Sequence, residues 1–196
     1  MLSPNDPARS ASAPGAHEAA RVQLSLSEIN ALCFKAARGA GLDWGEAEEA
    51  GWAAAWLSRA GLAGPTIILG WLNDLAKLAR PAPEPGRWAP RARAQCPLRT
   101  GIALADFAGL AEGPGAHVLT LVAVAHPRVT LPFLSRAALR LGRGLSVGWG
   151  GGRVLLDAAG RPSGSAIPGG AYPGGADMTI APVADPAPTA AARDAA

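Results

Sequence analysis

The sequence is poor in lysine and cysteine, and it has no long apolar run. Lys35 and Lys77 are the only lysines among 18 basic residues, so nearly every permanent positive charge is an arginine. Two cysteines, Cys33 and Cys96, are too few for a disulfide framework and lack the spacing of a metal site. This predicts a reduced, cytoplasmic protein without a metal. The longest apolar stretches are far too short to cross a bilayer, and the N-terminus lacks the apolar core of a secretory signal.

Several familiar nucleotide and hydrolase motifs are also missing. The sequence contains no G-x-x-x-x-G-K-[ST] phosphate loop and no G-x-G-x-x-G between a strand and a helix. Its one G-x-S-x-G, Gly144 to Gly148, runs into a predicted hairpin strand and not into a strand-to-helix turn, so it is not a nucleophile elbow. These absences remove the usual support for an NTPase, a Rossmann dehydrogenase or an α/β-hydrolase, and they give no reason to expect a cofactor.

The composition nevertheless supports a folded protein. Hydrophobic residues make up 49% of the 196 residues, which is enough for a core, and the abundance of Ala, Arg and Pro is typical of a GC-rich bacterial genome. The net charge of +3 is mildly basic and favours anionic partners only weakly.

The first half of the chain predicts three helices joined by short loops. Ser27 is the expected N-cap of the first helix, and the glycines after Arg38 end it. Asp43 is the expected N-cap of the second. Pro65 opens a third helix whose apolar stripe extends to Ala79. These helices should pack together as one small unit over residues 23–80.

The second half predicts a mixed sheet with one amphipathic helix, so the fold class is α+β. Residues 81–100 are rich in Pro and Arg and predict a linker or surface loop before an α+β unit over 101–181. The terminal segments 1–22 and 182–196 are predicted to be disordered, because they contain few large apolar residues. The expected elements of the sheet unit are a possible strand in 101–109, a strand at 117–125, a helix within 127–144, a hairpin of 145–149 and 153–157, and a last strand in 177–183.

His126 is the best single candidate for chemistry. It follows a predicted strand and precedes Pro127 and a predicted helix, and α/β proteins often bind ligands at such junctions. A histidine that only caps a turn is the simpler interpretation. Arg91, Arg93 and Arg99 lie in the Arg-rich loop and are candidate ligand-binding residues if that loop reaches His126.

Trp44 is a further ligand-binding candidate, because it stands beside backbone donors at the start of the second helix. The other tryptophans of the helical unit have helical spacing and are expected to be core residues. Glu46, Glu48 and Glu49 lie in the first turns of the same helix without a nearby histidine. They are interpreted as charges that complement the helix dipole.

Three arginines of the predicted 127–144 helix, Arg136, Arg140 and Arg143, recur at helical spacing and form a stripe opposite the apolar face. Such a stripe is a candidate polyanion-binding surface. A nucleic-acid partner is nevertheless not expected, because the net charge is small and no recognition-helix or RNP-type motif is present. A solvated helix face is the simpler interpretation of the stripe.

The phrase "LSLSEINALCFKAARGAGLDWGEAEEAGWAAAWLSRAGLAG" resembles the start of a bacterial family catalogued only as a domain of unknown function. "AHPRVTLPFLSRAALRLGR" and the W-G-G hairpin after it are similar to the later part of that family, so the resemblance covers Leu24 to Asp157. It implies a shared architecture and no activity. The first helices also show a weaker likeness to malate/lactate dehydrogenases that lack a Rossmann fold. The Ser-His-Gly of that family is absent, since the corresponding stretch reads Leu62-Ala63-Gly64.

Two functions are therefore expected from the sequence. The first is a non-enzymatic binding or accessory subunit of a cytosolic bacterial complex, with a protein partner, because no catalytic constellation assembles. The second is a small enzyme or ligand-binding protein for an anionic metabolite, with its site near His126 and the Arg-rich loop.

Overall fold

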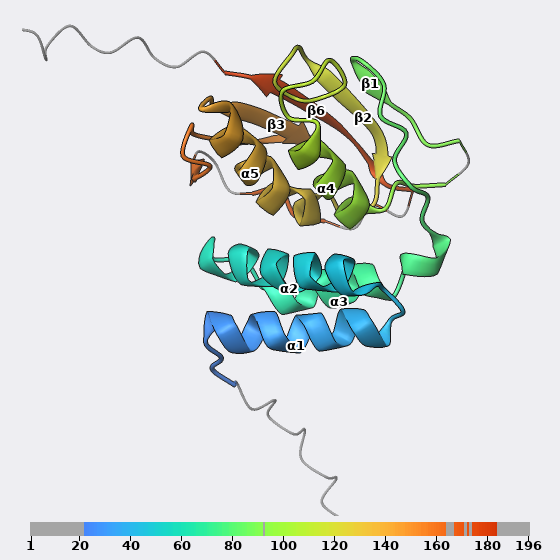
Figure 1. The fold of residues 1–196 in the computed structure, drawn as a ribbon, viewed down its shortest axis with the longest axis vertical. Helices are drawn as coiled ribbons and strands as arrows, with labels where there is room; N and C mark the ends of the chain where they lie inside the picture. The colour runs from blue at the N-terminus through green and yellow to red at the C-terminus, as the bar shows by residue number, and fades with distance from the viewer. Residues whose placement is uncertain (1–21, 92, 164–166, 171, 173, 184–196) are drawn as a thin grey trace, which may run out of the picture.

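The computed structural model describes residues 22–91, 93–163, 167–170, 172 and 174–183. Its elements stack in layers, which Figure 1 shows from bottom to top: helix α1 (Leu26–Gly39), then α2 (Trp44–Arg59) with α3 (Gly64–Leu72), then α4 (Pro97–Asp106) with α5 (Leu131–Leu141), and last a six-stranded sheet. The predicted α+β class, with helices before the sheet, is confirmed. The predicted tails lie outside the described residues, except for Val22, Pro182 and Val183.

The ends of the first two helices follow from local capping. Ser25, and not the expected Ser27, is the N-cap of α1, because Ser25 and Glu28 form a reciprocal capping box. Asp43 caps α2 as predicted, and its side chain accepts a hydrogen bond from the Glu46 amide.

Small residues allow the three N-terminal helices to approach closely. The α2 residues Ala47, Ala50, Ala53 and Ala54 are all fully buried. A Cβ atom on Gly51 would lie 2.7 Å from the Asn30 carbonyl oxygen, and one on Gly64 would collide with the Ala54 carbonyl. Glycine is therefore required at both crossings, and the Ala-rich composition of α2 has a packing role.

The third helix is shorter than predicted. It ends at Leu72, and a separate 3-10 turn, η1 (Leu75–Lys77), follows. The expectation of a continuous stripe to Ala79 is wrong, because Ala79 forms a backbone bridge with Gln95 that a helix would preclude.

The predicted linker contains regular structure. Strand β1 (Arg87–Trp88) pairs in parallel with β2 (Leu119–Val124), and helix α4 begins at Pro97. Trp88 is fully buried, and its indole nitrogen donates to the Glu112 carbonyl. The strand expected in 101–109 is wrong, because Pro97–Asp106 forms a helix that buries Leu98, Gly101 and Leu104.

The remaining strands are β3 (Leu145–Trp149), β4 (Gly152–Leu156), β5 (Pro162–Ser163) and β6 (Ala176–Pro182). The sheet order is β1-β2-β6-β3-β4-β5, and every pair except β1–β2 is antiparallel. The predicted β3–β4 hairpin is confirmed. Gly150 and Gly151 both have positive φ in its two-residue turn, which a type I′ turn requires.

Helices α4 and α5 bury side chains on two sides. Leu104, Leu131 and Leu134 belong to the core against the sheet. Leu98 and Phe133 belong to the second core, which they share with buried residues of α1, α2 and α3. The sheet therefore carries α4 in addition to the one amphipathic helix expected, and the helical unit packs on the outer side of this pair.

Candidate functional site

The end of strand β2 is irregular and strained. Its pairing with β6 shifts register between Leu121 and Val124, which marks a β-bulge. Ala123 has φ 52° and His126 has φ 44°, and they are the two non-glycine residues with positive φ in the described part of the chain. Left-handed backbone costs a non-glycine residue about 1–2 kcal/mol. Both bulges and such strain concentrate at functional sites.

Contacts from β6 hold this irregular segment in place. The Ala123 amide donates to Oδ1 of Asp177 at 2.9 Å. Gly175 packs against the Ala123 backbone so closely that a Cβ atom there would lie 2.5 Å from the Ala123 carbonyl carbon. The surrounding structure therefore imposes the conformation that positions His126.

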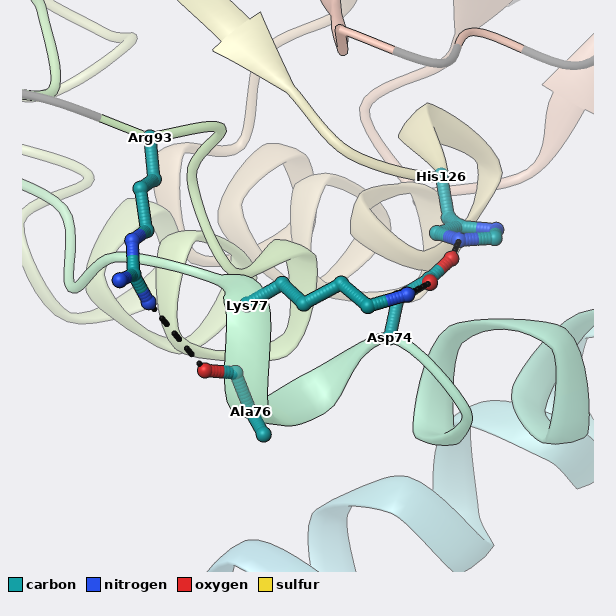
Figure 2. A network of polar contacts seen from close by, with 5 residues as sticks. All are labelled: Asp74, Ala76, Lys77, Arg93 and His126. Carbon is teal, nitrogen blue, oxygen red and sulfur yellow. Dashed lines mark hydrogen bonds and ion pairs between the residues drawn. The ribbon is translucent and has the colours of Figure 1, made fainter.

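His126 forms a polar network with the segment after α3. Its Nε2 lies 3.1 Å from Oδ2 of Asp74, and Oδ1 of Asp74 accepts from Nζ of Lys77 at 3.0 Å. Figure 2 shows the Asp74 carboxylate between the imidazole ring and the Lys77 ammonium group. The hydrogen bond from Lys77, followed by that from His126, lowers the pKa of the Asp74 carboxyl below its ordinary value.

Two cavities open beside His126. The larger, of about 770 Å³, is bordered by η1, by the β2 bulge, by the described residues of the 90–94 loop, and by Gly170, Tyr172, Gly174 and Gly175. The smaller, of about 250 Å³, is bordered by α3, by the start of η2 (Pro127–Thr130), and by Gly170 and Tyr172. We call the two together the His126 cleft. The volume of the larger cavity is within the range of small-molecule sites.

The His126 cleft is rich in positive charge. Lys77, Arg91 and Arg93 line the larger cavity, and Arg128 lines the smaller. Asp74 is the one carboxylate among the described lining residues. Arg93 donates to the Ala76 carbonyl at 3.4 Å (Figure 2), which brings the 90–94 loop to η1. Four permanent cations therefore face a single acid.

The structure brings together three of the residues proposed from the sequence and separates two others. His126, Arg91 and Arg93 line the same cavity. Arg99 lies on α4 and instead donates to both carboxylate oxygens of Glu46, at 2.6 and 2.9 Å. The hydrogen bond with Glu46 raises the pKa of Arg99. Trp44 packs edge-on against Phe34 and donates to Glu48, and it lines neither cavity.

The arginine stripe of α5 is mostly occupied by contacts within the protein. The Arg136 guanidinium donates to both carboxylate oxygens of Glu49, at 2.9 and 3.0 Å, and lies 4.0 Å from the centre of the Trp52 ring. Arg140 donates to the Ala105 carbonyl. Arg143 is exposed and lies beyond α5, which ends at Leu141 and is capped by the left-handed Gly142, so the predicted stripe does not extend to it. The polyanion-binding surface stays a prediction, and two of its three members have structural partners.

Sequence reasoning missed Asp74, Lys77, Arg128 and Tyr172 as members of the cleft. Asp74 and Lys77 were not predicted as site residues, because the third helix was expected to continue through them. Arg128 had a usable signal, since it stands two residues after His126 in "AHPR". Tyr172, the one tyrosine of the chain, lies in a Gly/Pro stretch that predicts only a loop.

The cleft has the parts for anion binding and for proton exchange. When Nε2 of a neutral His126 donates to Asp74, Nδ1 is left as an acceptor. Gly70 of α3, which borders the smaller cavity, faces the Cε1–Nδ1 edge of the ring. No cysteine or serine lines either cavity among the described residues. Cys96 is fully buried, and burial raises the pKa of its thiol, so the structure offers no activated thiolate there.

No three His, Cys, Asp or Glu side chains of the described residues group closely enough to hold a metal ion. No helix in the described ranges combines the length and apolarity that a membrane crossing requires.

Comparison with known proteins places part of the chain. No curated protein and no solved structure matches it. A family model matches the chain from α1 through β1 and α4 to the loop before β2. The match therefore includes the segment that was predicted to be a linker. The similarity seen in the sequence beyond Ala116 lies outside that match. Residues 24–116 match the family described as Protein of unknown function (DUF3726), which confirms the resemblance for this part of the chain.

Proposed function

We propose that the protein binds a small anionic molecule, carrying a carboxylate or phosphate group, in the His126 cleft. The observation that carries this proposal is the convergence of Lys77, Arg91, Arg93 and Arg128 on cavities that hold one carboxylate. These cations come from η1, the 90–94 loop and η2, which are separated in the sequence. Folding alone would disfavour such a gathering, because like charges repel.

The charge balance of the cleft supports an anion as its missing partner. Neither Arg91 nor Arg128 has an ion-pair partner within the described part of the chain, whereas Arg99 and Arg136 each have a glutamate. Charge-assisted hydrogen bonds between guanidinium groups and carboxylate or phosphate are among the strongest polar contacts in proteins. A bound anion would relieve the repulsion and gain these contacts at once.

His126 adds a reactive group to this binding site. Asp74 fixes the ring through Nε2, which is how carboxylates orient catalytic histidines, and Nδ1 is free to exchange a proton with a ligand. The strained backbone at His126 and Ala123 fits this role, since strain of this kind is maintained where the side-chain direction matters.

The test is isothermal titration calorimetry on the full chain with inorganic phosphate, pyrophosphate, butyrate, succinate and uncharged succinamide. The anions should bind and succinamide should not. Arg91→Gln with Arg93→Gln should weaken anion binding by about tenfold or more, because two charged contacts are lost. Asp74→Asn should tighten it by a few-fold, because the one opposing charge is removed.

Arg143→Gln is the matched control, because it removes an equal charge from an exposed site that lines neither cavity. Its affinity for the anions should change by less than about twofold, since distant exposed charges are screened. Anion affinities that fall equally in the control and in the cleft variants would contradict the proposal, as would the absence of any anion binding.

The other expectations from the sequence stay predictions. They are a role as an accessory subunit, a protein partner and a cytoplasmic location. Native mass spectrometry of the protein from its own lysate tests the subunit role, because an obligate partner would remain bound at fixed stoichiometry.

A further inference from the structure

The two cavities of the His126 cleft are adjoining compartments. Both are bordered by His126, Gly170 and Tyr172. The larger compartment continues from these residues towards η1 and the 90–94 loop, and the smaller continues towards α3 and η2. A ligand that passes His126 would therefore occupy both.

Permanent positive charge is present at both ends of this path. Lys77, Arg91 and Arg93 line only the larger compartment, and Arg128 lines only the smaller. The Arg128 guanidinium lies beside the Gly169–Gly170 segment, since its Nη2 is 3.7 Å from the position that a Cβ on Gly169 would take. The acid Asp74 borders the larger compartment, where three cations outweigh it, and the smaller contains no acid among its described residues.

The size of the smaller compartment limits what Arg128 can bind. Its volume of about 250 Å³ is about a third of that of the larger compartment, about 770 Å³. This accommodates one carboxylate or phosphate group with a few carbon atoms. The apolar side chains of Ile67 and Pro127 in its wall suit such carbon atoms and offer no competing charge.

We propose that the ligand carries two anionic groups, one bound by Lys77, Arg91 and Arg93 and the other by Arg128, with the connecting atoms beside His126. This inference rests on the proposed function and narrows it from an anion to a short dianion. It also explains why the cations are divided between two compartments, since a single anionic group would need only one. The connecting atoms would then lie within reach of the ring nitrogen that Asp74 leaves free.

The experiment compares single and double anions of matched chemistry by calorimetry on the full chain at constant ionic strength. The pairs are butyrate with succinate, pentanoate with glutarate, and inorganic phosphate with pyrophosphate. Each double anion should bind about tenfold tighter or more than its single partner if both ends are engaged. The pair with the largest ratio of affinities between double and single anion shows whether the natural ligand carries carboxylate or phosphate groups.

Arg128→Gln tests the second end. It should abolish the advantage of the double anions over their single partners, because the second anionic group loses its cation. Arg128→Lys should restore part of the advantage, which shows that charge and not folding is responsible. Arg91→Gln should weaken both members of a pair, and Arg143→Gln neither.

The possible failures can be told apart. Single and double anions that bind equally, or an Arg128→Gln variant that weakens both equally, would overturn the dianion while the proposed anion site stands. Absence of binding by every anion, with Arg91→Gln indistinguishable from the Arg143→Gln control, would overturn both.

Discussion

Arginines in two regions of the molecule have opposite surroundings. Between the helical layers, Arg99 and Arg136 each donate two hydrogen bonds to the carboxylate of a glutamate on α2, and Arg136 also lies over Trp52. In the His126 cleft, Arg91 and Arg128 face cavities and have no acidic partner within the described residues. The first group joins α4 and α5 to α2. The second group provides positive charge that is available to a bound anion.

The difference shows that residue type and spacing do not assign a role to an arginine. Arg136 belongs to a regular basic stripe, which in sequence is typical of an exposed or polyanion-binding face. Tertiary structure places Glu49 and Trp52 opposite it and makes it an internal contact. Arg128 stands alone in sequence, and the strained turn after β2 places it at a cavity.

The largest expected effect is at the layer interface. Phe133 is fully buried and packs edge-on against Trp52, with ring centres 5.5 Å apart. Phe133→Ala should reduce the free energy of unfolding by about 3–5 kcal/mol, through lost burial and the cavity that remains. Chemical denaturation measures this. Leu139→Ala, on the exposed side of the same helix, should cost less than about 0.5 kcal/mol, and equal losses in the two variants would contradict the layered packing.

The second prediction compares the two groups of arginines directly. Arg136→Ala should cost about 2 kcal/mol of stability, because it removes a two-contact ion pair, partly screened by solvent, and a cation–π contact. Arg128→Ala should change stability by less than about 0.5 kcal/mol. A double-mutant cycle with Glu49→Gln isolates the ion pair. Similar losses for Arg136→Ala and Arg128→Ala would remove the distinction between interface and cleft.

The third prediction concerns strain, which the described interface helices lack and the cleft contains. Ala123→Gly should stabilise the protein by about 0.5 kcal/mol, since glycine accepts positive φ while the flexibility it adds to the unfolded chain offsets part of the gain. Ala125 has no positive φ, so Ala125→Gly should destabilise by about 0.5–1 kcal/mol. Thermal and urea unfolding of both variants check this. Destabilisation of equal size at both positions would show that Ala123 is unstrained.

The smallest effect is a pH dependence in the cleft. Folding lowers the pKa of Asp74, so its contribution to stability is complete above its unfolded pKa and is lost as pH falls through the lowered value. Asp74→Asn removes that contribution, and the variant should lose less stability than the wild type between about pH 6 and about pH 3. The difference is small because the group is exposed to solvent. Urea unfolding at the two pH values measures it, and identical pH responses would contradict it.

Local signals in the sequence were sufficient for much of the fold. Asp43 as an N-cap, the Val- and Leu-rich β2, and the glycines of the β3–β4 turn each specify their own structure through neighbouring residues. Helix α4 was missed because its start, Cys96-Pro97, lies inside a Pro- and Arg-rich run that predicts irregular structure. Its burial depends on α5 and α2, which are distant in sequence.

The site was accessible to sequence reasoning only in part. His126 was found because a histidine between a strand and a helix is a recognisable arrangement, and Arg91 and Arg93 because their loop is rich in arginine. Asp74 is separated from His126 by 52 positions, and Glu49 from Arg136 by 87. Pairings at such distances depend on tertiary structure, so no local pattern could reveal the Asp74 partner or show that Arg136 is already engaged.

The shared position of α4 and α5 has a consequence for synthesis on the ribosome. Helices α1, α2 and α3 are complete once Leu72 has been made, but their core also requires Leu98 and Phe133. At roughly 5–20 residues per second, the ribosome needs several seconds to reach Phe133. During that interval the apolar surface that includes Trp52, the ring partner of Phe133, lacks its cover. The nascent chain therefore passes through a stage in which it is open to chaperone binding or to association with a neighbouring chain.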